Sequence, residues 1–172
     1  MTRCFIAIDL PENVKKQVLE IQEKLPEFKG KKTEIKNLHL TLKFLGEVDE
    51  KLLKKVEDRL KGVSFKKFEA EISERGVFRE DFVKIVWLKM SNCDALQKEI
   101  DDSLESLFEK ESVFMGHLTI ARVKFCERES FLKSLKKIKT KNIKFQVDRF
   151  KLKKSDLTRG AIYTDLLEVE LE

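Results

Sequence analysis

Apolar positions in the first half of the chain change their spacing from one segment to the next, and each spacing predicts one kind of element. The stretch RCFIAIDL is almost continuously apolar, which indicates a buried strand. In the segment that follows, apolar side chains recur every three or four residues, as on one face of a helix. This half is therefore expected to contain a strand at 3–10, a helix at 11–25, a strand at 37–48, a helix at 49–60 and a strand at 65–73.

The second half repeats the same order of elements. FVKIVWLKM predicts a strand, and the next segment again has helical spacing. The expected elements are a strand at 82–90, a helix at 92–110, a strand at 113–125, a helix at 127–138, a strand at 142–154 and an extra strand at 161–171. We interpret the chain as a divergent duplication with approximate repeats 1–78 and 79–154, folded as one domain over 1–172 because no Pro/Gly/Ser-rich linker separates the halves.

The only two histidines of the chain occupy equivalent places in this repeat. His39 begins HLTL and His117 begins HLTI, 78 positions later. Because alternate side chains of a strand share a face, His39 lies on the face of Thr41, and His117 lies on the face of Thr119. A duplication with rough two-fold symmetry would bring two imidazoles and two hydroxyls to a common cleft.

These four side chains suit the cleavage of a phosphodiester. One neutral histidine can accept a proton from an attacking hydroxyl or water, while a protonated one gives a proton to the leaving oxygen. Both states are accessible near neutrality because the unperturbed pKa of histidine is about 6.5. The threonine hydroxyls can donate hydrogen bonds to the non-bridging phosphoryl oxygens. No metal is expected.

The two histidines could instead have a structural role, bind a metal or belong to a nucleophilic triad. One histidine on a strand is more often a hydrogen-bonded structural residue. Two histidines at equivalent positions of a repeated motif instead favour a functional role. A zinc site normally needs at least three protein ligands, and no Asp, Glu or Cys lies within three residues of either histidine. A nucleophilic triad with a Ser or Cys stays open, although no GxSxG occurs.

Charge and cysteine content add little. The chain has 36 Lys and Arg against 31 Asp and Glu, a net charge of +5, which is a mild bias towards anionic partners. Three scattered cysteines without CxxC spacing indicate reduced thiols. The apolar run CFIAI is too short for a signal peptide or membrane span, so we expect a soluble, cytoplasmic protein with no membrane partner.

The sequence resembles the two-histidine phosphoesterase superfamily, whose mark is a pair of H-x-[TS]-x motifs with apolar x. More narrowly it resembles the 2′-5′ RNA ligase-like (LigT-like) RNA 2′,3′-cyclic phosphodiesterases. The resemblance rests on RCFIAIDLP, NLHLTLKFLGEV, KIVWLKM, HLTIAR and LKKSDLTRGAIY, and covers nearly the whole chain. Two places depart from the family pattern: Gly116 stands where Pro often precedes the second histidine, and 33–36 lack the usual Trp.

The resemblance implies an α+β fold with two pseudo-symmetric lobes, each an antiparallel sheet flanked by outer helices, with the active-site cleft between them. It implies hydrolysis of an RNA terminal 2′,3′-cyclic phosphate to a 2′-phosphate, and reversible 2′-5′ RNA ligation by the same attack. It further implies a monomer without cofactor, acting on RNA ends such as tRNA fragments. Two alternatives stay open: an RNA- or nucleotide-binding module without turnover, and a phosphodiesterase for small nucleotides such as ADP-ribose cyclic phosphate.

By resemblance, His39 is expected to be the proton donor and His117 the proton acceptor. In the family, an Arg at the spacing of Arg122 often helps hold the phosphate. On a regular pleat it would face away, so a bulge or the end of the strand must re-aim it. Lys43 has the parity to share the face of His39 and add positive potential, the alternative being a solvated surface lysine. Tyr163 and Phe44 are candidates for stacking on a base, the alternative being core packing.

Overall fold

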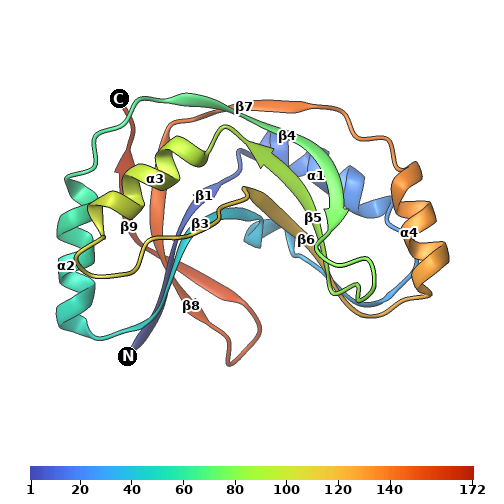
Figure 1. Ribbon diagram of the computed structural model, residues 1–172, viewed down its shortest axis with the longest axis horizontal. Helices are drawn as coiled ribbons and strands as arrows, with labels where there is room; N and C mark the ends of the chain where they lie inside the picture. The colour runs from blue at the N-terminus through green and yellow to red at the C-terminus, as the bar shows by residue number, and fades with distance from the viewer.

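The expected alternation of elements is confirmed by the computed structural model, which describes residues 1–172 (Figure 1). The strands are β1 (Thr2–Asp9), β2 (Lys29–Lys32), β3 (His39–Val48), β4 (Phe68–Val77), β5 (Ile85–Ser91), β6 (His117–Phe125), β7 (Ile143–Val147), β8 (Arg149–Asp156) and β9 (Ile162–Glu170). The helices are α1 (Glu12–Glu23), α2 (Glu50–Lys61), α3 (Asp94–Ser103) and α4 (Arg128–Lys137), with a 3₁₀ turn at Ile35–Asn37. The short strand β2 was not expected, and α3 ends well before the predicted residue 110.

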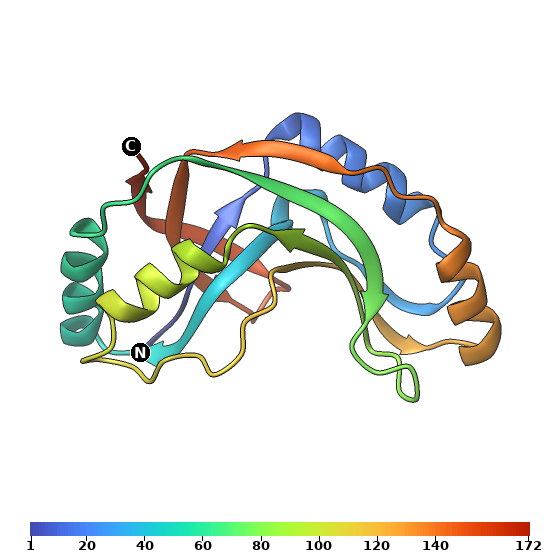
Figure 2. The same cartoon turned by 45° about the horizontal axis from the view of Figure 1, so that its top comes forward.

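All nine strands belong to one antiparallel sheet, in the order β7-β4-β5-β6-β3-β1-β8-β9, with β2 added to β6. The two histidine strands, β3 and β6, are neighbours at the centre, but they pair only at Leu40 and Leu118. The sheet therefore splits into two lobes of four main strands on either side of this junction. Figure 2 shows the arch that the two lobes form.

The two lobes in space do not coincide with the two repeats in sequence. Strand β4 closes the first repeat but pairs with β5 and β7 of the other lobe, and β8 of the second repeat pairs with β1. Helices cross over as well: α2 and α3 lie beside the β3 lobe, and α1 and α4 beside the β6 lobe (Figure 1). Each repeat thus contributes elements to both lobes, and neither repeat has a complete core alone.

The segment 142–154, expected as one strand, is two strands on opposite sides of the molecule. The chain leaves β7, which pairs with β4, and after Asp148 enters β8, which pairs with β1 and β9. No Gly or Pro marks this crossing, and the backbone carbonyl of Asp148 instead accepts a hydrogen bond from Leu171 N. The expected N-cap of α2 is confirmed, because Asp49 accepts from Leu52 N at 2.7 Å.

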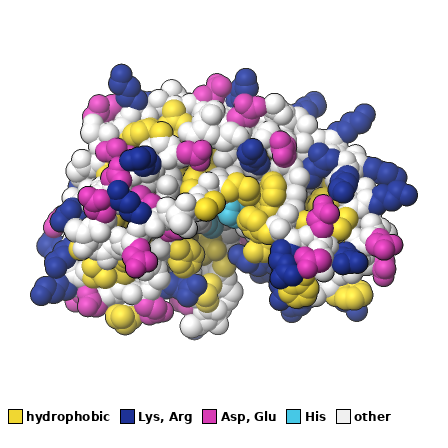
Figure 3. All heavy atoms as spheres, in the orientation of Figure 1, with side chains coloured by type: hydrophobic (Ala, Val, Ile, Leu, Met, Phe, Trp, Pro, Cys, Tyr) yellow, Lys and Arg dark blue, Asp and Glu magenta, His cyan; other side chains and the backbone are white.

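Apolar side chains from both lobes form one continuous core of 39 buried residues. Leu40 and Leu118 are fully buried where the two central strands meet, so the backs of the two motifs pack in this core. None of the helices is long and apolar enough to cross a membrane. The polar sides of the same strands face a hollow between the lobes, in which Figure 3 shows a histidine.

Candidate active site

Each histidine strand contains a β-bulge at the last residue of its motif. In β3 the pairing with β1 skips Leu42, and in β6 the pairing with β5 skips Ile120. Two successive residues are then buried in each strand, Leu42 with Lys43 and Ile120 with Ala121. Because a bulge shifts the alternation by one residue, the next side chain returns to the face of the histidine.

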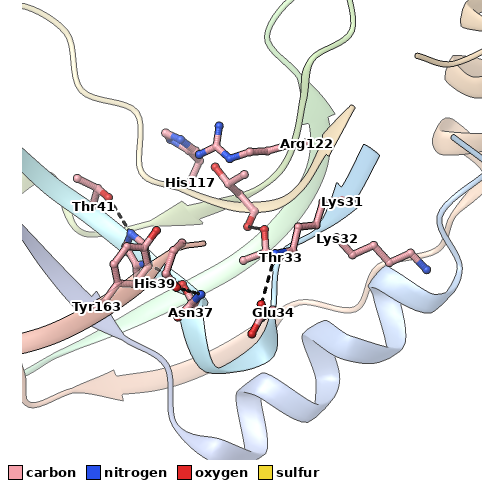
Figure 4. A pocket seen from close by; sticks show the side chains of 12 residues that line it. Lys31, Lys32, Thr33, Glu34, Asn37, His39, Thr41, His117, Arg122 and Tyr163 are labelled. Carbon is pink, nitrogen blue, oxygen red and sulfur yellow. Dashed lines mark hydrogen bonds and ion pairs between the residues drawn. The ribbon is translucent and has the colours of Figure 1, made fainter. Parts of the chain in front are cut away.

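In β6 this shift brings Arg122 into the cleft. This is the position that Arg122 needs for the phosphate-binding role that the resemblance implies. Arg122 lines the same cleft as His117 and Thr119, and Figure 4 shows its side chain beside the imidazole. In β3 the equivalent side chain is Phe44, which was expected on the buried side of a regular strand. It is instead half exposed, stacked on Phe5 at a centroid distance of 5.9 Å.

The same shift overturns the expectation for Lys43. Its ammonium does not line the cleft; it is buried beneath the sheet, where it donates to Asp101 Oδ1 at 2.5 Å and to the carbonyl of Glu109 at 2.8 Å. Asp101 also accepts from Gln97 and from the backbone N–H of Glu111. Lys43 is therefore neither a cleft cation nor a solvated surface lysine, but the anchor of the segment that leads into β6.

Both imidazoles are oriented by the same backbone contact. His39 Nδ1 lies 2.7 Å from the carbonyl of Asn37, and His117 Nδ1 lies 2.9 Å from the carbonyl of Met115. A carbonyl can only accept, so Nδ1 carries the proton in each ring. This leaves Nε2 as the nitrogen that gains or loses a proton in the cleft.

His39 is packed more tightly than its counterpart. Its ring lies 5.0 Å from Phe5 and edge-on to Tyr163 at 5.2 Å, and Nε2 is 3.1 Å from Thr41 Oγ1. Burial lowers the pKa of His39, and the positive charge of Lys153 lowers it further, while the hydrogen bond to Asn37 opposes both. In the free protein, His39 is thus biased towards the neutral form.

His117 lacks the imidazole–threonine hydrogen bond of the first motif. Its ring meets the edge of one aromatic side chain, Phe78, at 5.1 Å and 90°. Thr119 is held through its backbone, because its carbonyl accepts from Thr33 Oγ1 at 2.8 Å. The Thr119 hydroxyl is therefore free to donate to a ligand in the cleft.

The cleft has a volume of about 250 Å³ and contains both motifs. Figure 4 shows His39 and Thr41 facing His117 across it. The twelve lining residues are Lys31, Lys32, Thr33, Glu34, Asn37, His39, Thr41, His117, Thr119, Arg122, Ala161 and Tyr163. The predicted quartet and Arg122 are thus brought together, with Tyr163 in the wall beside His39.

Sequence reasoning missed the side of the cleft that β2 and the 3₁₀ turn provide. Asn37 orients His39 through its carbonyl and also donates from Nδ2 to the carbonyl of Ala161 at 2.9 Å, which connects the β8–β9 hairpin to the first motif. Lys31, which pairs with Arg122, and its neighbour Lys32 add positive charge to the lining of the cleft. The run KGKK was the only available signal, and nothing in it indicates pairing with a strand some 90 residues later.

Metal ligands are not gathered in the cleft or elsewhere. No group of three His, Cys, Asp or Glu side chains lies close enough together to hold a metal ion. Asp9, the carboxylate nearest His39 in the sheet register, is engaged by Lys151 at 2.9 Å and Lys153 at 3.1 Å.

Comparisons with known proteins agree with this geometry. The family model described as LigT like Phosphoesterase matches twice, at residues 8–87 and 90–163, so the duplication is recognised in both halves. A protein of Methanocaldococcus jannaschii named RNA 2′,3′-cyclic phosphodiesterase is 38% identical, with 96% of this chain and 99% of that protein aligned. A protein of the same name from Thermotoga maritima is 37% identical over 99% of this chain and 96% of its own length.

Solved structures share the fold. The protein TT0787 of Thermus thermophilus superposes with a TM-score of 0.80 at 26% identity, covering 98% of this chain and 97% of the other. E. coli LigT complexed with 3′-AMP also gives 0.80, at 24% identity, covering 99% of this chain and 98% of the other. With both halves matched and relatives above 30% identity over nearly the whole length, this chain belongs to the LigT-like phosphoesterase family.

Proposed function

We propose that the protein is an RNA 2′,3′-cyclic phosphodiesterase that opens the terminal ring to a 2′-phosphate by paired-histidine acid–base catalysis. The observation that carries the proposal is the meeting of His39, Thr41, His117 and Thr119 in one cleft with Arg122. The names of the relatives from M. jannaschii and T. maritima support the substrate class.

In this mechanism one Nε2 accepts a proton from water as the water attacks phosphorus. The other Nε2 gives a proton to the 3′-oxygen as its bond to phosphorus breaks, leaving the phosphate on the 2′-oxygen. Thr41, Thr119 and Arg122 donate to the non-bridging oxygens, where negative charge is concentrated in the transition state. The Nδ1–carbonyl contacts hold both rings in the required tautomer.

We assign the acid to His39 and the base to His117, as the family resemblance implies. Burial lowers the pKa of His39, which taken alone would favour the base role. The acid role therefore requires the anionic phosphate to raise the pKa of His39 when substrate binds. A substrate with a good leaving group at the 3′ position tests this, because its departure needs no acid, and the acid's Ala variant should regain activity on it.

The deciding experiment is product analysis on a defined RNA with a 2′,3′-cyclic phosphate, in the presence of excess EDTA. We expect a 2′-phosphate end at an unchanged rate, because the proton transfers use imidazoles. Loss of activity that zinc or magnesium restores would show that a metal is required and contradict the mechanism. Binding without turnover would instead identify a nucleotide-binding module.

Ligation uses the same site. Attack by the 5′-hydroxyl of a second RNA in place of water would give a 2′-5′ linkage with the same acid and base. Incubating the cyclic-phosphate RNA with a 5′-hydroxyl RNA, and separating the products by size, measures the ratio of joining to hydrolysis.

A further inference from the structure

A row of cations leaves the cleft along the pair of strands β2 and β6. Past its bulge, β6 turns Arg122 and Lys124 outward on the side of His117, and β2 places Lys31 opposite Arg122. Together the two strands, KGKK and HLTIARVKF, hold five Lys and Arg and no Asp or Glu.

This basic ladder, defined as Lys29, Lys31, Lys32, Arg122 and Lys124, is held in register by tight backbone packing. Gly30 has φ +149°, and a Cβ at this position would lie 2.2 Å from the carbonyl of Arg122. Glycine thus allows β2 to lie directly against β6.

The far end of the ladder carries an exposed aromatic ring. Phe125 pairs with Lys29, is 62% exposed, and borders a hollow of about 380 Å³. Two carboxylates flank this hollow, Glu27 and Glu127, and Glu34 contacts Lys31 at 3.4 Å near the cleft. Neither Lys29 nor Lys124 takes part in any ion pair, so both ammonium groups are available to an anionic partner.

We propose that the basic ladder binds the single-stranded RNA on the 5′ side of the terminal cyclic phosphate, with Phe125 stacking on one of its bases. This rests on the proposed function and extends it: the preferred substrate is an oligonucleotide, not a small cyclic nucleotide. A basic track with an aromatic ring is the usual chemistry for binding single strands without sequence preference. From His117 to Phe125 the strand rises about 26 Å, enough for several nucleotides.

The equivalent track on the other lobe lacks this chemistry. Where β6 has Arg122, β3 has Phe44, whose exposed ring is covered by the Arg3 guanidinium at 5.1 Å. Further along β3 the exposed charged residue is Glu47. The charge asymmetry therefore gives the RNA one direction in which to leave the cleft.

The test compares kcat/KM for cyclic mononucleotide with that for 5′-labelled RNAs of increasing length, all ending in a 2′,3′-cyclic phosphate. For the wild-type protein, kcat/KM should rise with length and level off at roughly four or more nucleotides, when the strand reaches past Phe125. The gain should shrink with salt, with a log–log slope of about 0.7 for each phosphate contacted.

The variant Lys29→Gln/Lys124→Gln should lower kcat/KM for the long RNA about ten-fold and leave the mononucleotide unchanged. Neither lysine lines the cleft. The matched control is Lys51→Gln/Lys55→Gln on α2, which removes the same charge from exposed positions of the other lobe. Phe125→Leu should also lower only the long-RNA value, and Phe125→Trp should preserve it, because tryptophan can stack.

The outcomes separate the two proposals. If no cyclic phosphate of any length is hydrolysed, the proposed function fails. If mononucleotide and RNA are hydrolysed with equal kcat/KM, or if the ladder and control variants behave alike, the function stands and the RNA track is wrong.

Discussion

The two histidine strands have equivalent motifs and equivalent bulges, yet the side chains that they place around the two imidazoles differ. In β3 the bulge buries Lys43 and exposes Phe44, and the imidazole is enclosed by Phe5 and Tyr163. In β6 the residue buried at the equivalent place is Ala121, and the exposed one is Arg122. The His39 imidazole thus lies between two aromatic rings, whereas the His117 imidazole contacts one aromatic ring, Phe78, and has Arg122 beside it in the cleft.

This difference shows how a duplicated fold can serve a reaction that is not symmetric. Ring opening needs an acid on one side of phosphorus and a base on the other. Two histidines in identical environments would favour the same protonation state, whereas the reaction needs one protonated and one neutral. Burial and Lys153 lower the pKa of His39. The side chains around the two histidines therefore differ, although the backbones of the two motifs are alike.

The largest expected effect is the loss of either imidazole. His39→Ala and His117→Ala should each lower kcat about 10²- to 10⁴-fold, the usual contribution of a general acid or base. Rates on a cyclic-phosphate RNA and on a substrate with a good 3′ leaving group give the comparison. Rescue by the second substrate in His39→Ala alone supports His39 as the acid, and rescue in His117→Ala alone reverses the assignment. Near-full activity of both variants would end the two-histidine mechanism.

The second-largest expected effect is on stability and concerns only the β3 lobe. Lys43→Met removes the buried partner of Asp101 and should lower the free energy of unfolding by about 3–5 kcal/mol, because the carboxylate remains buried without its counter-charge. The measurement is urea unfolding. The matched control is Ala121→Val at the equivalent place in β6, which removes no charge and should cost less. An equal loss in both variants would show that the ion pair is not what makes Lys43 important.

The hydroxyls come third. Thr41→Ala and Thr119→Ala should each slow turnover roughly 10- to 1,000-fold if they donate to the phosphoryl oxygens. Thr41→Ala should have an additional effect, because only Thr41 also contacts the histidine of its own motif: its Oγ1 lies 3.1 Å from His39 Nε2. This variant should therefore shift the pH–rate profile, and Thr119→Ala should leave the profile's position unchanged. If both threonine variants turn over at the wild-type rate, the hydroxyls have no catalytic role and the threonines only favour strand formation.

Local patterns predicted the elements and the quartet because they depend on short-range alternation. His39 and Thr41 share a face by strand geometry alone, and the repeat supplied the second pair. For β6, either a bulge or the end of the strand was expected to re-aim Arg122. For β3, a regular alternation was expected through Lys43 and Phe44. A bulge is set by pairing with a distant strand, so the same parity rule that placed the histidines misplaced the two residues after the motif.

Long-range pairing also explains the other misses. The exchange of β4 and β8 between lobes, the break after Asp148 and the pairing of β2 with β6 all join segments far apart in sequence. Asn37 was missed because its role lies in its carbonyl, which every residue possesses. Only the three-dimensional arrangement shows that this carbonyl faces an imidazole.

The smallest expected effect is a change in the proton affinity of His39. Lys153 lowers its pKa, so Lys153→Met should raise that pKa, whereas Lys151→Met, which also breaks ion pairs with Asp9 and Asp165, should shift it less. The pKa of His39 in each variant can be measured by following the histidine Cε1–H resonances by NMR as a function of pH. Titration of wild-type His39 should fall below the ordinary value of about 6.5.

The same pKa shift has a consequence for stability, with a fixed sign. A histidine whose pKa is lower in the folded than in the unfolded protein binds fewer protons when folded, so its contribution to stability is present above about pH 6.5 and is lost as pH falls through the folded pKa. The free energy of unfolding should therefore decline in this window, and less steeply in His39→Gln, which cannot titrate. A decline of the same steepness in His39→Gln and the wild type would assign it to the carboxylates, and the contrast between the two lobes would then rest on packing alone.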